Sequence, residues 1–375
     1  MTPQPPGIDE RLLAALDGRP VDDVLFDLGI RRALFLERYK SGEVRKFVAA
    51  LNEDVFPDLL DKLEARLRRI DDRGEDVGIE STERLKKLAT ELRGTLAEGI
   101  HAASKPLRDE LKELAVKESR WQKAVLQANV PLQVSMTGPN LPLLRSIVGQ
   151  RPFAGATLDQ WFGDLTTKAQ RGVERQLTIG LTQGETVPQL VQRIRGTRAL
   201  GFSDGVLEAT RSEAERLVRT AVGHVSNNAR LETFRANADV VAGRVWHATL
   251  DERTCPICGL RDGQVFDLED DTAPVPPAHP NCRCVLQART KTWKELGIRL
   301  RDAPPGVRAS MDGPVKATTT WSDWIDGPGS DHAAEALGPG RVALWQAGKI
   351  TLDDLVSQRD RILTLDELEK LSGGS

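Results

Sequence analysis

The chain has 375 residues, of which 39% are hydrophobic and 29% are charged, and its net charge is −3. This composition is typical of a folded globular protein of two or three compact units, and it argues against both a disordered chain and a polycation that coats nucleic acid. There is no run of about eighteen apolar residues and the N-terminus lacks the pattern of a signal peptide, so we expect neither a membrane span nor export.

Helical periodicity dominates the first third of the chain. Within 1–78 the apolar residues recur at helical spacing in separate pieces, which predicts short helices with breaks and a turn near 71–78. Within 79–130 apolar residues, mostly leucines, recur every three or four residues with charges between them, which predicts one long amphipathic helical segment. Pro106 interrupts this pattern and is expected to kink or split the helix. The apolar stripe is expected to pack within the chain, with packing on a second subunit as the alternative.

A change of composition separates the helical parts. Residues 131–156 are rich in proline, glycine and asparagine, which predicts an extended linker. Residues 157–240 then show the clearest helical pattern of the chain, and we predict a central helical domain there, with its last helix beginning near Asp204.

Two helix starts in this domain are marked by the same local device. Thr157 with Gln160, and Thr186 with Gln189, have the spacing of a capping box, in which two side chains satisfy the free N–H groups of the first turn. The helix that begins near Thr186 is expected to stop at Gly196.

Short strands are predicted only after the central helices. Alternating residues in 244–250 predict a first strand, 264–267 a second, and the residues from Val285 onward a third. We assign these strands to a module over 241–290 and expect a C-terminal tail with short helices over 291–375. The predicted fold class is therefore mainly α, with helical N-terminal and central regions, a small β-containing zinc-knuckle module and a helical tail.

The cysteines of the chain cluster beside a histidine, in a pattern suited to a metal ion: Cys255, Cys258, His279, Cys282 and Cys284. A Cys-x-x-Cys pair can turn two thiolates toward one cation, and a His-x-x-Cys pair can supply the other half of a tetrahedral site. Reduced core cysteines and two disulfides are the alternatives, and the paired spacing with a histidine favours metal over both. We therefore predict a structural zinc site.

Five donors compete for four tetrahedral positions. The preferred set is Cys255, Cys258, His279 and Cys282, and the alternative replaces His279 with Cys284. A filled coordination shell leaves no position for a reactive water, and the sequence has no Ser/His/Asp, phosphate-loop or paired-acid pattern, so we predict that the protein is not an enzyme. A zinc hydrolase with an open position is the least favoured alternative.

The residues around this cluster resemble the Mu F-like head morphogenesis proteins of tailed phages, also called minor capsid or minor head proteins. The resemblance rests on three motifs: Trp246 to Cys258 (WHATLDERTCPIC), Asp262-Gly263, and Pro276 to Cys284 (PPAHPNCRC). It extends over 155–370 and reaches the N-terminal third only in helical character. Ala221 departs from the pattern, because many relatives have an acid at that place.

The resemblance implies a role in assembly. It implies a portal protein oligomer and other capsid proteins as partners, with packaged double-stranded DNA as a further candidate and no membrane. It also implies a place in the virion, inside the capsid near the portal, after assembly in the host cytoplasm. Some relatives are linked to genome delivery.

A zinc-dependent nucleic-acid-binding module is the alternative function. Four arginines near the cysteines have the charge to line phosphates: Arg253, Arg261, Arg283 and Arg289. Acidic residues between 267 and 271 weaken this interpretation.

Overall fold

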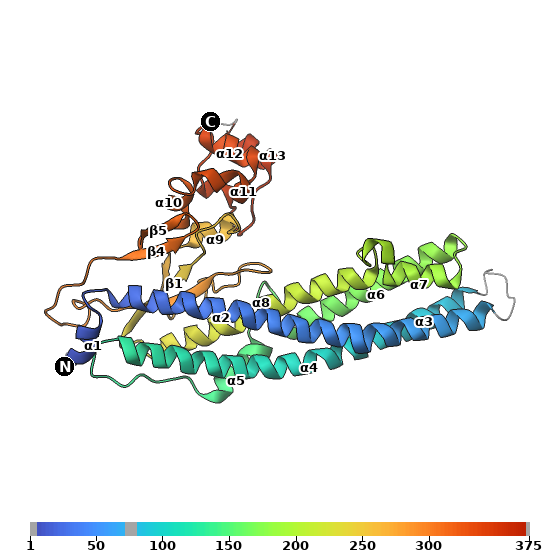
Figure 1. Cartoon of the computed structure of the whole chain (residues 1–375), viewed down its shortest axis with the longest axis horizontal. Helices are drawn as coiled ribbons and strands as arrows, with labels where there is room; N and C mark the ends of the chain where they lie inside the picture. The colour runs from blue at the N-terminus through green and yellow to red at the C-terminus, as the bar shows by residue number, and fades with distance from the viewer. Residues whose placement is uncertain (1–5, 72–80, 373–375) are drawn as a thin grey trace. The chain divides into compact units, whose positions relative to one another are not determined.

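A computed structural model of the chain describes residues 6–71 and 81–372 (Figure 1). Helices dominate the described residues, and the few strands among them all lie after residue 240, so the predicted mainly α class is confirmed. Residue contacts divide the chain into two compact units. Unit 1 comprises Met1–Leu36, Leu114–Arg145 and Gly223–Ser375, and unit 2 comprises Glu37–Glu113 and Ser146–Val222.

The N-terminal part is more continuous than predicted. Its helices are α1 (Glu10–Ala15), α2 (Val21–Ala50), a π-helical segment η1 (Leu51–Val55) and α3 (Phe56–Asp71). The prediction of short helices with breaks is wrong for 21–71, because no proline stands between Pro20 and Pro57, and Pro57 falls in the first turn of α3, where a missing N–H is tolerated. Apart from Asp71, the turn expected over 71–78 lies outside the described residues.

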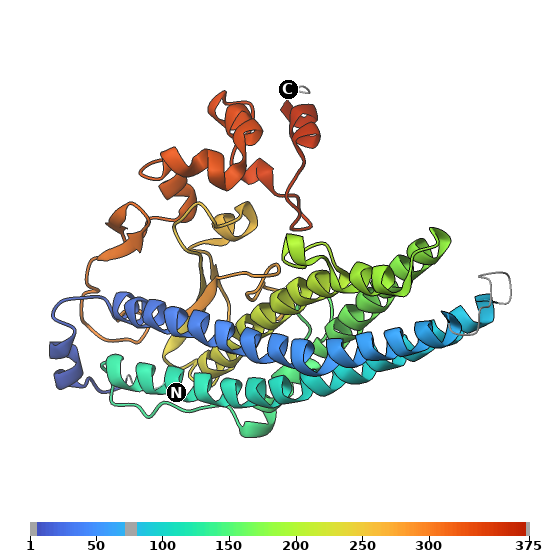
Figure 2. The same ribbon diagram turned by 45° about the vertical axis from the view of Figure 1, so that its right-hand side comes forward.

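The predicted long helix is present as α4 (Ser81–Asn129), and Pro106 does not split it. Its apolar stripe is buried within the chain, as predicted, at Leu88, Leu92, Leu96, Ile100, Leu107, Leu111, Leu114 and Val125. In unit 2 the first half of α4 runs beside α3 (cyan and blue in Figure 2), where Arg66 Nε lies 2.7 Å from Glu91 Oε2 and Lys62 Nζ donates to Thr95 Oγ1 at 3.1 Å.

A helix interrupts the stretch that was expected to be an extended linker. Helix α5 spans Leu141–Gln150, so the expectation is wrong for these residues. Asn140 accepts a hydrogen bond from the N–H of Leu143 at 2.8 Å, and Pro142 occupies the first turn. Both features are local helix-start signals, and the proline and glycine content of the stretch outweighed them in the prediction.

The central helices follow the predicted pattern: α6 (Leu158–Thr182), α7 (Val187–Arg195) and α8 (Val206–Arg235). Both capping boxes are confirmed. At the first, the N–H of Thr157 donates to Gln160 Oε1 at 2.7 Å, and the N–H of Gln160 donates to Thr157 Oγ1 at 3.4 Å. Helix α7 ends where predicted, with Gly196 in a backbone conformation of φ 97° that favours glycine.

A three-stranded antiparallel sheet in unit 1 has the order β2-β1-β3. Its strands are β1 (Val241–His247), β2 (Val265–Phe266) and β3 (Val285–Thr290), close to the three predicted strands. Strand β1 ends before the predicted Leu250 because the N–H of Ala248 donates to the Asp262 carboxylate at 2.8 Å instead of continuing the ladder. Trp246 pairs in register with Leu286, and both side chains are fully buried.

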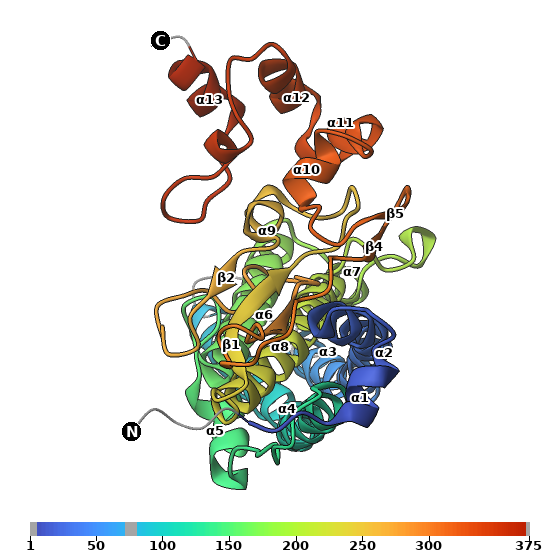
Figure 3. The same ribbon diagram turned by 90° about the vertical axis from the view of Figure 1, so that its left-hand side faces the viewer.

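The C-terminal part carries the predicted short helices and one hairpin that was not predicted. The hairpin consists of β4 (Val307–Ser310) and β5 (Gly313–Lys316), and Figure 3 shows the helices that follow it: α10 (Trp321–Ile325), α11 (Ala333–Leu337), α12 (Pro339–Gln346) and α13 (Leu365–Ser372). Short 3-10 turns lie at Arg198–Leu200, Ser330–His332 and Asp353–Leu355. Helices α10 to α13 pack on a small core that includes Trp321, Trp324, Leu355 and Leu368.

Candidate metal centre

The structure brings the five predicted donors together from two segments of unit 1. Cys255 is the N-cap of the short helix α9 (Pro256–Arg261), and Cys258 lies in its only full turn, so both sulfurs face the same end of the helix. His279 and Cys282 come from the loop between β2 and β3, where the N–H of Cys282 donates to the carbonyl of His279 at 3.2 Å. Cys284 directly precedes β3. The Cys-x-x-Cys pair was expected after a strand, and the helix that carries it was not predicted.

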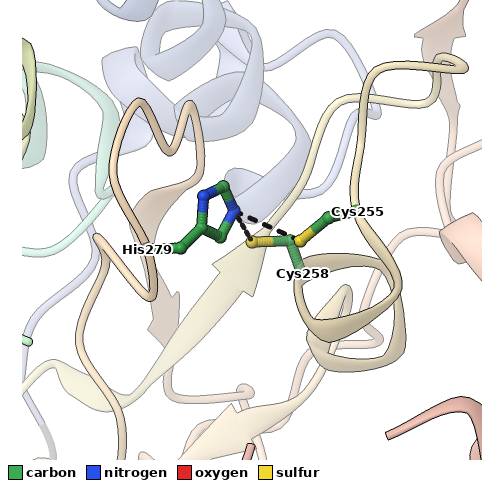
Figure 4. A group of neighbouring side chains, drawn as sticks. All are labelled: Cys255, Cys258 and His279. Atoms are coloured by element: carbon green, nitrogen blue, oxygen red, sulfur yellow. Dashed lines mark hydrogen bonds between the residues drawn. The ribbon is translucent and has the colours of Figure 1, made fainter. Parts of the chain in front are cut away.

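Short distances join four of the donors in a chain of contacts. Figure 4 shows His279 pointing its Nε2 between two sulfurs, at 3.2 Å from Cys255 Sγ and 3.2 Å from Cys258 Sγ. Cys258 Sγ lies 3.7 Å from Cys282 Sγ. Cys258, Cys282 and Cys284 form a second trio whose sulfurs lie within 4.8 Å of one another. All four cysteines are free thiols, so the disulfide alternative has no support here.

These separations match the edges of a small tetrahedron. Bonds of about 2.3 Å to sulfur and about 2.0 Å to nitrogen place two sulfur ligands about 3.8 Å apart, and a sulfur and a nitrogen about 3.5 Å apart. The observed 3.7 Å between Cys258 and Cys282 agrees with that value, and the two 3.2 Å contacts of His279 are slightly shorter. The two trios could therefore hold a metal ion.

The imidazole of His279 is oriented for ligation through Nε2. Its Nδ1 lies 2.8 Å from the carbonyl oxygen of Pro280, which can only accept a hydrogen bond. The proton of a neutral His279 is therefore held on Nδ1, and the lone pair of Nε2 faces the sulfurs. Histidine ligands of metal ions usually have such a partner at the second ring nitrogen.

An ion pair holds the two donor segments against each other. Both Nη atoms of Arg283, the residue between Cys282 and Cys284, donate to the carboxylate of Asp251 at 2.7 Å. Asp251 also accepts hydrogen bonds from the N–H of Arg253 at 3.1 Å and from Thr254 Oγ1 at 3.2 Å, just before Cys255. Burial raises the pKa of Asp251, but the hydrogen bonds from Arg283 and the arginine charge outweigh it, and the net pKa is lowered. Asp251 is therefore ionised, and we call its ion pair with Arg283, which joins the two donor segments, the Asp251–Arg283 brace.

The buried carboxylate of Asp262 fixes the C-terminal end of α9. Asp262 accepts hydrogen bonds from the N–H groups of Ala248 and Trp321, both at 2.8 Å, and forms an ion pair with Arg308 at 2.9 Å. Helix α9 also packs closely on Trp321, because a Cβ added to Gly259 would lie 2.1 Å from Trp321 Cε3. Only glycine fits at position 259, so α9 and α10 are in direct contact.

The sulfurs and the imidazole are electrostatically coupled. The hydrogen bond with Cys258 lowers the pKa of Cys255 to about 5, and the hydrogen bond with Cys255 raises the pKa of His279 to about 9. Contact with Cys255 and then Cys282 raises the pKa of Cys258, whereas contact with Cys258 lowers that of Cys282. Burial raises the pKa of Cys284. The cluster therefore favours thiolates at two positions, and the thiolate is the form that binds metal.

The arginines of the alternative function are largely engaged by acids. Arg261 pairs with Asp360 at 2.6 Å and lies over the Trp246 ring, and Arg289 pairs with Glu295 at 3.1 Å. Arg283 is held by Asp251, as described above. Of the four, only the exposed Arg253 has no charged partner among the described residues. The surface around the cluster is therefore less suited to phosphates than the sequence alone indicated.

The residues that hold the two donor segments together were not predicted, although Asp251 and Arg283 both lie within the sequence motifs. Asp251 and Arg283 flank the cysteines, but spacing along a chain does not reveal that they pair across 32 residues. His247 on β1 lies outside the donor groups: its ring centre lies 4.5 Å from that of Phe26, with the two rings tilted by 55°, and burial together with the charge of Arg308 lowers its pKa to about 3. His332 contacts Asp312 at 3.0 Å and lies beside Glu252 and Glu335.

Comparison with known proteins gives one match. Residues 171–287 match the family model described as phage Mu protein F like protein. This confirms the predicted resemblance over that region, which contains all five donors. No curated protein and no solved structure matches the chain. Among the described residues, no helix is both long and apolar enough to cross a membrane.

Proposed function

We propose that the protein is a minor capsid protein of a tailed phage that acts in head morphogenesis, because residues 171–287 match the phage Mu protein F-like family. The family match supports a phage head-related role and association with the virion. The observation that carries the proposal is that the matched region includes the whole donor cluster and both halves of its Asp251–Arg283 brace.

The metal of the proposed function is zinc, held by Cys255, Cys258, His279 and Cys282. Three thiolates and one imidazole form a set that zinc prefers in structural sites. His279 belongs in this set because its Nε2 contacts two of the sulfurs at 3.2 Å. Cys284 then lies beside the site as a buried neighbour of Cys258 and Cys282. Bound zinc would join α9 to the loop before β3 and so rigidify the module.

The proposed role is structural, without catalysis. Four protein donors fill a tetrahedral shell and leave no position at which a water could be activated. A cobalt-substituted protein tests this point: a four-coordinate spectrum with sulfur-to-cobalt charge transfer, unchanged by added azide or cyanide, is the expected result. A spectrum that shifts with such a ligand would indicate an open position and reopen the hydrolase alternative.

The proposed partner is the portal protein oligomer, with other capsid proteins around it. The protein would act inside the capsid near the portal, after assembly in the host cytoplasm. The resemblance to minor head proteins supports this placement, and the rigid metal module supplies a defined surface for recognition. A part in genome delivery, with contact to packaged DNA, is a further element of the proposal.

Co-purification with the portal tests the assembly role. The full-length chain and the portal protein of the same phage are co-expressed, and tagged portal rings are isolated and analysed by mass spectrometry together with purified virions. We expect the chain in both samples, in fewer copies than the major capsid protein. The tagged major capsid protein in a parallel preparation controls for nonspecific capture. Absence from both portal rings and virions would rule the proposal out.

DNA contact is tested separately. Binding of the full-length chain to a DNA duplex is measured over a range of salt concentrations, since phosphate contacts make affinity fall steeply with salt. A steep fall that disappears in Arg253→Ala would favour the nucleic-acid alternative, and a flat response would argue against it.

A further inference from the structure

A groove in unit 2 lies between the segment 43–58 of α2, η1 and α3 and the segment 95–110 of α4. Its volume is about 360 Å³. The floor is apolar and includes the buried side chains of Phe47, Val55 and Leu107. Ala102 and Pro106 on the α4 wall are exposed, so the groove faces solvent. None of the lining residues lies within 171–287, and the inference below therefore does not depend on the proposed function.

Small residues and two helix irregularities shape the groove. Gly99, Ala102, Ala103 and Pro106 lie at helical spacing along the α4 wall. Gly99 permits close packing, since a Cβ there would lie 2.7 Å from Val55 Cγ1. The π-helical η1 forms part of the opposite wall, and Pro106 has no N–H to donate to the carbonyl of Ala102 one turn earlier. The α4 wall therefore carries only small side chains at these positions. The carbonyl of Ala102 does not accept the usual helical hydrogen bond from residue 106.

The rim is strongly acidic, with five carboxylates against one lysine: Glu43, Asp54, Asp58, Glu98, Glu110 and Lys46. Lys46 Nζ lies 2.8 Å from Glu43 and 3.5 Å from Glu110, so one cation serves two acids. Asp58 pairs with Lys62, outside the lining, at 2.8 Å. Asp54 and Glu98 are exposed and have no ion-pair partner among the described residues. The rim therefore carries uncompensated negative charge on both sides of an apolar floor.

We propose that this groove docks one amphipathic helix of a partner protein, with small apolar side chains against the floor and lysine or arginine side chains on the rim. A groove between two helices suits a third helix that inserts apolar anchors at i, i+3, i+4 and i+7. The volume is at the low end for a small-molecule pocket but is sufficient for one or two inserted side chains. The sign of the rim charge selects a basic partner, and the two exposed acids are placed to steer its approach.

A selection experiment tests the identity of the occupant. A library of displayed peptides, half patterned as amphipathic helices with random charges and half unpatterned, is selected against the full-length chain. It is counter-selected against Ala102→Trp, which fills the groove from an exposed position on α4. Enriched peptides are expected to be helical, with basic residues flanking an apolar stripe.

Fluorescence anisotropy with an enriched peptide then locates the site. Asp54→Lys with Glu98→Lys is expected to weaken binding about tenfold, in keeping with the loss and reversal of two rim interactions. Glu53→Lys with Asp61→Lys is the matched control, because these exposed acids lie on the same helical segments as the groove wall but do not line it. Ala124→Trp, exposed on α4 outside the groove, controls for the added tryptophan. Both controls should change affinity less than about twofold.

Three outcomes overturn the proposal. The first is enrichment of unpatterned or acidic peptides, or of none. The second is equal loss of affinity in the groove and control variants, which would indicate general attraction to a negative surface. The third is calorimetric binding of spermidine to the full-length chain that is lost in Ala102→Trp while no peptide binds, which would make the occupant a small organic cation. Circular dichroism melting of every variant verifies that it is folded.

Discussion

Glu118 on α4 is the centre of a buried ionic network in unit 1, and its removal should be among the most damaging single substitutions in the chain. Its side chain is fully buried and accepts hydrogen bonds from Arg230 Nε and Arg32 Nε, both at 2.8 Å. Arg230 is also fully buried and donates to the carbonyl of Leu286 on β3 at 3.1 Å. Both guanidinium groups lie near the Trp121 ring, at 5.2 and 5.7 Å.

The expected loss follows from what each arginine can do without the carboxylate. Arg32 is 14% exposed and can turn toward solvent, whereas Arg230 has no such path and would remain as a buried charge without a counter-ion. Breaking one side of a buried ion pair typically costs about 3–5 kcal/mol. Glu118→Gln should therefore lower the free energy of unfolding by about 3 kcal/mol or more. Glu118→Leu with Arg230→Met should recover much of this loss, because an apolar pair leaves no charge behind.

Urea unfolding monitored by tryptophan fluorescence measures these differences. Glu215→Gln on α8 is the control, since this exposed acid should change stability by less than about 0.5 kcal/mol. A loss below about 1 kcal/mol in Glu118→Gln, or a double variant less stable than the single one, would refute the reasoning. Either result would mean that the network relaxes or admits water when the carboxylate is removed.

Three further changes test other parts of unit 1. Cys258→Ser should abolish the expected content of about one zinc per chain, measured by elemental analysis, and leave the helical circular dichroism largely intact; full zinc content in this variant would contradict the ligand set. Asp262→Ala should lower the free energy of unfolding by about 3 kcal/mol because it leaves the buried Arg308 without a counter-ion. Limited proteolysis of this variant should then cut before α10, and protection equal to that of the parent chain would contradict the prediction. Burial raises the pKa of Asp22, which accepts two hydrogen bonds from Thr290. The fold therefore favours the protonated carboxyl of Asp22. Its contribution to the free energy of unfolding is complete below the unfolded pKa of about 3.9 and is lost as pH rises through the folded pKa. Asp22→Asn should gain stability relative to the parent as pH rises from 4 to 7 in urea titrations, and a constant difference would be inconsistent with the shift.

Features coded within a few residues were predicted well. The capping boxes at Thr157 and Thr186, the stop at Gly196 and the stripe of α4 all depend on neighbours one turn away. The donor cluster was also predictable as a set, because cysteine is rare in this chain and its paired spacing has few other uses. Local chemistry therefore identified both the mainly helical class and the candidate metal residues.

Features that depend on tertiary partners were missed. The Glu118–Arg230 pair joins residues 112 positions apart, and no spacing along the chain reveals that the two side chains meet. The end of β1 was predicted three residues too late because the carboxylate of Asp262, fourteen residues after Ala248, accepts the N–H of Ala248 in place of a strand partner. The groove of unit 2 needed the π-helical η1, which has no sequence signature of its own.

The contact of Gly259 with Trp321 gives the molecule an intrinsic optical probe. The indole of Trp321 lies on the turn that carries Cys258, and its Nε1 donates to the carbonyl of Asp251 at 3.3 Å. Any shift of α9 would alter the surroundings of this ring, and with them its emission. Comparing the emission of the parent chain with that of Trp321→Phe during chelator treatment would therefore follow release of the proposed zinc ion in real time, without a dye or a label.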